Sequence, residues 1–117
     1  MLFICYPKCT TCQKARKWLT EHGIPFEERH IKEAPPTVQE LSAWQAASGL
    51  PLRKFFNTSG QLYRSLALKD RLAAMSEEEQ LSLLASDGML VKRPLLVDGD
   101  TVLVGFREEA WQKALIK

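Results

Sequence analysis

Residues 2–12, LFICYPKCTTC, contain an apolar run followed closely by two cysteines that are separated by two residues. The continuously apolar residues 2–6 are typical of a short strand buried on both faces. A helix is predicted from Thr10 to about His22, with Gly23 as its stop signal. Residues 26–31 can form a second strand, which would run parallel to the first because a helix crosses between them. The N-terminal third of the chain therefore predicts a βαβ unit with the cysteines at the start of its helix.

The pair Cys9 and Cys12 points to thiol chemistry. A cysteine at the start of a helix ionises more readily, because unpaired backbone N–H groups and the helix dipole favour the thiolate. Lys8, Lys14 and Arg16 add positive charge nearby. We predict that Cys9 attacks as a thiolate and that Cys12, one helical turn on, resolves the mixed disulfide.

Two other interpretations of the cysteines compete with this one. The spacing of Cys5, Cys9 and Cys12 matches the three-cysteine motif of radical iron–sulfur enzymes. However, Cys5 falls in a strand-like run, and 117 residues leave no room for the barrel of such enzymes. No second pair or neighbouring histidine completes a zinc site. A structural role as a small buried apolar side chain is the preferred interpretation for Cys5 alone.

Length and composition indicate one globular domain. The 117 residues suit a single domain, and 45% hydrophobic residues are enough for a core. The net charge of +2 is too small to suggest nucleic-acid binding. No apolar run approaches a membrane span, and the N-terminus lacks a signal-peptide pattern. A cytosolic, reducing location is therefore expected, in which cysteines seldom serve as structural disulfides.

The middle of the chain predicts a helical block. Thr37-x-x-Glu40 is a capping-box signature, and the helix after it should turn Val38, Leu41 and Trp44 inward. Residues 50–57 suggest a short helix or turn, and residues 61–75 a broken helical stretch. A second capping box, Ser76-x-x-Glu79, starts a helix that ends near Gly88.

The C-terminal part predicts a hairpin and a final helix. Residues 95–97 and 101–104 are apolar runs that flank Asp98-Gly99-Asp100, a strong turn signal. Residues 107–116 have the pattern of an amphipathic helix. The order is βαβ, a helical block, ββ and α, which predicts an α/β fold with a mixed sheet.

Lys92-Arg93-Pro94 precedes the first hairpin strand. A proline at the mouth of a strand often marks a tight approach, and such a bond can be cis. This loop can lie beside Cys9, where Arg93 would hold an oxyanion or help to ionise the thiol. The alternative is that Lys92 and Arg93 are solvated loop charges.

The polar loop 57–60 can also reach the site. Solvated helix faces are the preferred interpretation for the basic residues of the helical block: Arg53, Lys54, Arg64, Lys69 and Arg71.

With these motifs assembled, the chain resembles the arsenate reductase–like (ArsC/Spx) family of the thioredoxin superfamily. Five segments carry the resemblance: residues 6–12, Pro35-Pro36, residues 63–68, Arg93-Pro94 and Val104-Gly105-Phe106. The resemblance implies a single domain over residues 1–117, with a thioredoxin-like mixed four-stranded sheet. The core would comprise about 1–35 and 89–117, and a helical insertion about 36–88. It also implies a cis Arg93–Pro94 bond next to Cys9.

The chain departs from the family's glutaredoxin-coupled arsenate reductases. Those enzymes use one nucleophilic cysteine and surround the oxyanion with three arginines. Here Cys9 matches the nucleophile and Arg93 one arginine, whereas Asn57 and Gly105-Phe106 stand where the other two are expected. Arg107 follows one position later, and Cys12 is an additional thiol. Arsenate turnover is therefore expected to be weak or absent.

The sequence leads to a cytosolic thiol–disulfide oxidoreductase resembling arsenate reductases, with Cys9, Cys12 and Arg93 as catalytic residues. No bound cofactor or metal is expected, and glutathione, glutaredoxin or thioredoxin would supply electrons. A monomer is expected.

The alternative is an Spx-like transcriptional regulator, with the disulfide as a redox switch. Such a regulator binds the C-terminal domain of the RNA polymerase α subunit. This chain lacks the longer tail of those regulators, and residues 47–56 differ from their polymerase-contacting region. A third interpretation is a family member that kept the fold and lost the chemistry.

Overall fold

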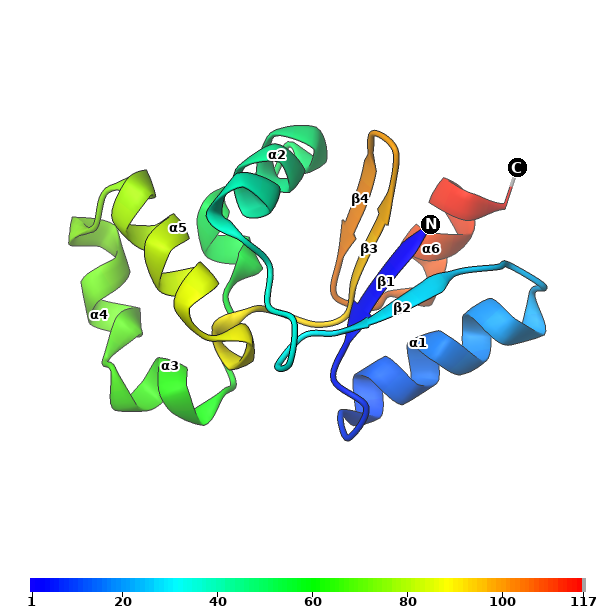
Figure 1. The fold of residues 1–117 in the computed structure, drawn as a ribbon, viewed down its shortest axis with the longest axis horizontal. Helices are drawn as coiled ribbons and strands as arrows, with labels where there is room; N and C mark the ends of the chain where they lie inside the picture. The colour runs from blue at the N-terminus through cyan, green and yellow to red at the C-terminus, as the bar shows by residue number, and fades with distance from the viewer. Residues whose placement is uncertain (117) are drawn as a thin grey trace.

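A mixed four-stranded sheet forms the centre of the computed structural model, which describes residues 1–116 (Figure 1). The strand order is β2-β1-β3-β4. Strand β1 (Leu2–Cys5) pairs in parallel with β2 (Glu27–His30), as the crossover helix requires. Strands β3 (Leu95–Asp98) and β4 (Thr101–Val104) form the predicted hairpin, and β3 pairs antiparallel with β1. The predicted α/β fold class is confirmed.

Helices α1 (Thr10–Glu21) and α6 (Glu108–Leu115) cover one face of the sheet. Successive side chains of a strand point to opposite faces, and Phe3 and Leu96 face this layer. They pack against Trp18 and Trp111, which are almost fully buried. The indole Nε1 of Trp111 donates to the Gly105 carbonyl 3.0 Å away, whereas Nε1 of Trp18 is buried with no partner among residues 1–116.

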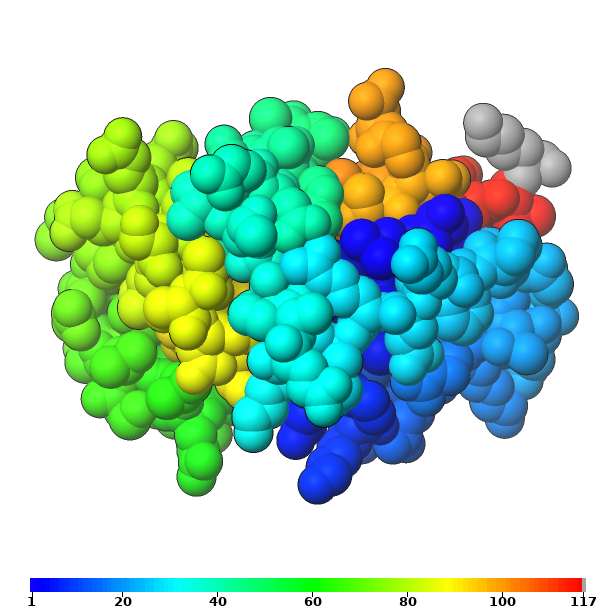
Figure 2. All heavy atoms as spheres, in the orientation of Figure 1, coloured from blue at the N-terminus to red at the C-terminus, as the bar shows by residue number. Residues whose placement is uncertain are grey.

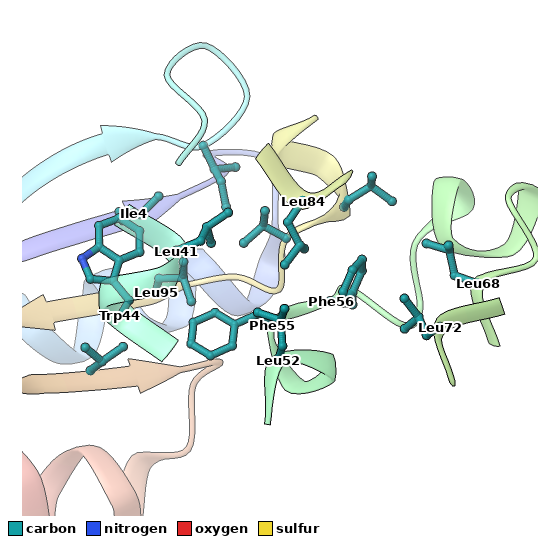
Figure 3. Close-up of a cluster of buried hydrophobic side chains, with 14 residues drawn as sticks. Ile4, Leu41, Trp44, Leu52, Phe55, Phe56, Leu68, Leu72, Leu84 and Leu95 are labelled. Atoms are coloured by element: carbon teal, nitrogen blue, oxygen red, sulfur yellow. The ribbon is translucent and has the colours of Figure 1, made fainter. Parts of the chain in front are cut away.

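The other face of the sheet packs against a helical segment that lies between β2 and β3 (Figure 1). Its helices are α2 (Val38–Ser48), α3 (Gln61–Ser65), α4 (Leu68–Arg71) and α5 (Glu77–Ser86), with short 3-10 turns at Leu52–Phe55, Leu72–Ala74 and Gly88–Leu90. Ile4 and Leu95 of the sheet meet Leu41 and Trp44 of α2, and Phe55 extends this core toward α4 and α5 (Figure 3). One continuous core therefore joins the segment to the sheet.

Both predicted capping boxes are present. Thr37 Oγ1 accepts from the Glu40 amide at 3.1 Å, and the Glu40 carboxylate accepts from the Thr37 amide at 3.0 Å. The same reciprocal pair starts α5. The prediction that Val38 faces inward is wrong, because its side chain is 36% exposed. Val38 is the first residue of α2, before the part of the helix that reaches the sheet.

Gly88 fixes how closely the end of the helical segment approaches β2. A Cβ atom at this position would overlap the carbonyl oxygen of Ile31 and lie 2.7 Å from its carbonyl carbon. We expect Gly88→Ala to lower the free energy of unfolding by about 1–3 kcal/mol, because backbone atoms must shift to make room. Urea denaturation of this variant and of Ser82→Ala, an exposed control on α5, measures the difference. Equal stability of the two variants would contradict the close approach.

Candidate functional site

Cys9 is the N-cap residue of α1. The turn that leads from β1 into the helix is closed by a hydrogen bond from the Cys9 amide to the Tyr6 carbonyl, at 2.9 Å. Cys9 has extended backbone angles, and its side chain forms no cap hydrogen bond. The first turn of α1 carries no acidic side chain, so nothing offsets the positive end of the helix dipole there. The half-buried Cys9 thiol therefore lies where a thiolate is electrostatically favoured.

Polar groups surround the Cys9 sulfur. Burial of the thiol acts to raise its pKa, and is the largest single effect. The neighbouring Cys12 and Thr11 amides, the Arg93 guanidinium and the Cys12 thiol act to lower the pKa, and together they outweigh burial. The pKa of Cys9 is consequently lowered from its ordinary value, which favours the reactive form of the thiol.

The pKa of Cys12 is shifted in the opposite direction to that of Cys9. It is fully buried on the inner face of α1, where its sulfur accepts from the Tyr6 amide at 3.4 Å. The neighbouring Cys5 thiol, burial and the charge of a Cys9 thiolate all act to raise the pKa of Cys12. Cys12 thus resists ionisation beside a thiol that ionises more readily than usual, which is the contrast expected of a nucleophile and its resolving partner.

The structure brings Arg93 to Cys9. The Arg93–Pro94 peptide bond is cis, as the family resemblance implied. The guanidinium carbon lies 5.3 Å from the centre of the Tyr6 ring, Arg93 and Cys9 line the same cleft, and the guanidinium acts to lower the pKa of the Cys9 thiol. Nε and Nη1 of Arg93 are buried and have no hydrogen-bond partner among residues 1–116. Arg93 is therefore no solvated loop charge, and its two unpaired donors are available to an anion bound at Cys9.

Cys9 opens onto a cleft of about 970 Å³ between the sheet and the helical segment. In Figure 2 the blue turn after β1 and the green part of the helical segment lie at the lower edge of the molecule, with cyan atoms of the segment after β2 between them in this view. The described residues that line the cleft include no acidic side chain and five basic ones: Lys54, Arg64, Lys92, Arg93 and Arg107. Within residues 1–116 none of the five forms an ion pair. The cleft is accordingly suited to a negatively charged ligand.

The cationic lining extends beyond what the sequence indicated. The loop 57–60 reaches the cleft, as the sequence allowed. Lys54 and Arg64, interpreted as solvated helix charges, line the cleft as well, and Arg64 is held by a hydrogen bond to the Ser59 carbonyl at 3.1 Å. Arg107 lines it from the segment after β4. No sequence signal separates these residues from other surface cations, because only the docking of the helical segment on the sheet brings them to Cys9.

Two other kinds of feature are absent from residues 1–116. No group of three or more His, Cys, Asp or Glu side chains is arranged to hold a metal ion. No helix in this range combines the length and the hydropathy needed to cross a membrane.

Comparisons with known proteins agree with the geometry. The model of the ArsC family matches residues 5–114. The uncharacterised protein YusI of Bacillus subtilis is 58% identical over 113 residues, which is 97% of this chain and 96% of YusI. A crystal structure of a possible arsenate reductase from Streptococcus mutans has a TM-score of 0.86 at 46% identity, covering 95% of this chain and 96% of that one. The global transcriptional regulator Spx of Enterococcus faecalis is 32% identical, over 93% of this chain and 81% of the regulator.

Proposed function

The chain belongs to the ArsC family, and on that premise we propose that it is a cytosolic thiol–disulfide oxidoreductase. Cys9 is the nucleophile, Cys12 the resolving thiol and Arg93 the group that stabilises the anionic sulfur. One observation carries the proposal: the ionisable Cys9 thiol faces a cleft lined by cations, with a neutral thiol one helical turn behind it.

The reaction follows from these contacts. The Cys9 thiolate attacks one sulfur of a disulfide substrate, the substrate S–S bond breaks, and a mixed disulfide forms while one thiolate leaves. Loss of the charge on Cys9 removes one of the effects that raise the pKa of Cys12. Cys12 then loses its proton and attacks the Cys9 sulfur, which releases the second substrate thiol and leaves a Cys9–Cys12 disulfide. Glutathione, glutaredoxin or thioredoxin returns two electrons to this disulfide.

The test is exchange with a defined disulfide. Fully reduced protein is mixed with oxidised glutathione or bis(2-hydroxyethyl) disulfide, quenched with acid and weighed by intact mass spectrometry. We expect a transient mixed disulfide and then a form lighter by two hydrogens. Protein that stays fully reduced with both substrates would contradict the proposal and favour a fold that has lost its chemistry. Arsenate, assayed with glutathione and glutaredoxin, is expected to turn over weakly, since Arg93 is the one arginine among the groups that act on the pKa of the Cys9 thiol within the described residues.

The lining of the cleft predicts a preference for anionic disulfides. We expect the double variant Lys54→Ala and Arg64→Ala to react up to about tenfold more slowly with oxidised glutathione at low salt, because two cations that attract it are removed. Its rate with cystamine, a cationic disulfide, should not fall. Stopped-flow rates at two salt concentrations measure both effects. The control Lys113→Ala removes an exposed cation that does not line the cleft. An equal loss for both disulfides would argue against charge recognition.

A second candidate function rests on the similarity to the Spx regulator of Enterococcus faecalis. In this role the chain binds the C-terminal domain of the RNA polymerase α subunit, and the state of Cys9 and Cys12 controls the interaction. A pull-down with that domain, with and without dithiothreitol, distinguishes the two functions. Binding in one redox state supports a regulator. Absence of binding in both states ends this candidate without affecting the oxidoreductase proposal.

A further inference from the structure

Cys5 is a third thiol that the proposed cycle does not use. It is the last residue of β1, its side chain is completely buried, and it belongs to the same packed cluster as Cys9 and Cys12. A guanidinium nitrogen of Arg16, Nη2, lies 3.6 Å from the Cys5 sulfur. Arg16 also pairs with the Glu28 carboxylate at 2.8 Å, so a fixed guanidinium lies against the buried Cys5 sulfur.

The three thiols lie in a defined order. Cys5 and Cys12 are buried in one cluster and Cys9 packs against it, and both Cys5 and Cys9 act on the pKa of Cys12. For Cys5, the contact with Cys12 is the main factor that lowers its pKa, ahead of the opposing effects of burial and of Glu28. Cys12 is therefore within reach of two thiols, one facing the cleft and one beneath the helix.

We propose that Cys5 is a redox partner of Cys12, so that oxidation passes from an outer Cys9–Cys12 disulfide to an inner Cys5–Cys12 disulfide. The inference rests on the proposed function, since the outer disulfide arises when the chain reduces a disulfide substrate. Cys5 would then take part in the thiol exchange in addition to packing in the core.

The step is an internal thiol–disulfide exchange with no net change in oxidation state. Cys5 gives up its proton and its sulfur attacks the Cys12 sulfur. A Cys5–Cys12 bond forms, the Cys9–Cys12 bond breaks, and Cys9 leaves as a thiolate. The proton goes to solvent or to the departing sulfur. The protein has already given two electrons to the substrate, and this exchange removes no more, so no further oxidant is needed.

The local environment favours this direction. A thiol of low pKa is the better leaving group, and the Cys9 thiolate is stabilised by the helix start and by Arg93. Expulsion of Cys12 from the inner bond is disfavoured, because its surroundings oppose ionisation. Arg16 supports ionisation of Cys5, and is held in place by Glu28, whose carboxylate oxygens lie 2.8 and 3.0 Å away.

The exchange predicts an unusual property of the oxidised protein. Its disulfide is buried, while Cys9 again faces the cleft as a free thiolate. Such a protein keeps one thiol that reacts with maleimide in the native state. If the outer disulfide were the end point, the remaining thiol would be the completely buried Cys5, and native protein would not react.

The sequence offers a direct assay. Wild-type protein is oxidised with one equivalent of bis(2-hydroxyethyl) disulfide, and free thiols are alkylated with iodoacetamide in denaturant. Trypsin then cuts after Lys8 and Lys14, which separates Cys5 in peptide 1–8 from Cys9 and Cys12 in peptide 9–14. We expect the two peptides to be cross-linked, with Cys9 carrying the alkyl group. Native oxidised protein should also take up one maleimide.

Two variants complete the test. In Cys5→Ala and Cys5→Ser the oxidised protein should contain only Cys9–Cys12 and should lose the maleimide-reactive thiol. A wild-type peptide 9–14 with an internal disulfide, together with an alkylated peptide 1–8, would overturn the inference and leave the proposed function intact. Wild-type protein with no disulfide at all would instead show that the proposed function has failed.

Discussion

Replacing Cys9 with serine is expected to abolish disulfide exchange, with a loss of at least roughly a thousandfold in rate. A serine hydroxyl does not ionise near neutral pH, so the donors around this position have no anion to stabilise. The measurement is the rate of thiol release from bis(2-hydroxyethyl) disulfide under pseudo-first-order conditions. Circular dichroism and urea denaturation of the variant establish that the fold is retained.

The matched control is Cys12→Ser. This variant keeps the nucleophile and loses the thiol that completes the cycle, so a mixed disulfide on Cys9 should accumulate and be visible by intact mass. The pair separates attack from resolution. If Cys9→Ser retained the rate of the wild type, or if the trapped adduct lay on another cysteine, the assignment of the nucleophile would be wrong.

Replacing Arg93 with methionine is expected to slow alkylation of Cys9 by iodoacetamide about tenfold at pH 7. The guanidinium acts to lower the pKa of the Cys9 thiol, and its loss leaves the effect of burial less opposed, so the pKa of the thiol rises. The alkylation rate measured against pH should show its midpoint shifted to higher pH. Arg93→Lys keeps the positive charge and should recover part of the rate. An unchanged midpoint in Arg93→Met would show that Arg93 does not act on the thiol.

The same interaction affects the pH dependence of stability. The pKa of Cys9 is lower in the folded than in the unfolded chain, so the folded state binds fewer protons between the two values. The free energy of unfolding should therefore rise as the pH increases from the folded pKa toward that of a free thiol, about 8.5. The gain is lost as the pH falls through the folded pKa. In Arg93→Met the rise should be smaller, which denaturation at several pH values can measure.

Signals that lie close together in the chain predicted the fold well. The capping boxes depend on two residues three positions apart, and the hairpin on the two-residue turn Gly99-Asp100, so tertiary structure was not needed to find them. The prediction that Val38 is buried was wrong, because the hydrophobic pattern of α2 does not show where along the helix contact with the sheet begins. That point depends on the docking of the whole helical segment.

The sequence by itself determined that a reactive cysteine starts a helix next to a second thiol, since strand, turn and helix follow directly from residues 2–21. Only the tertiary structure decided what surrounds that thiol. Lys54 and Arg64 come from the helical segment and Arg107 from beyond the hairpin, and packing on the sheet places them around one cleft. The same holds for Cys5, whose contact with Cys12 requires α1 to fold back onto β1. Local physics specified the position of the proposed nucleophile, whereas long-range packing specified the charges around it and brought Cys5 close to Cys12.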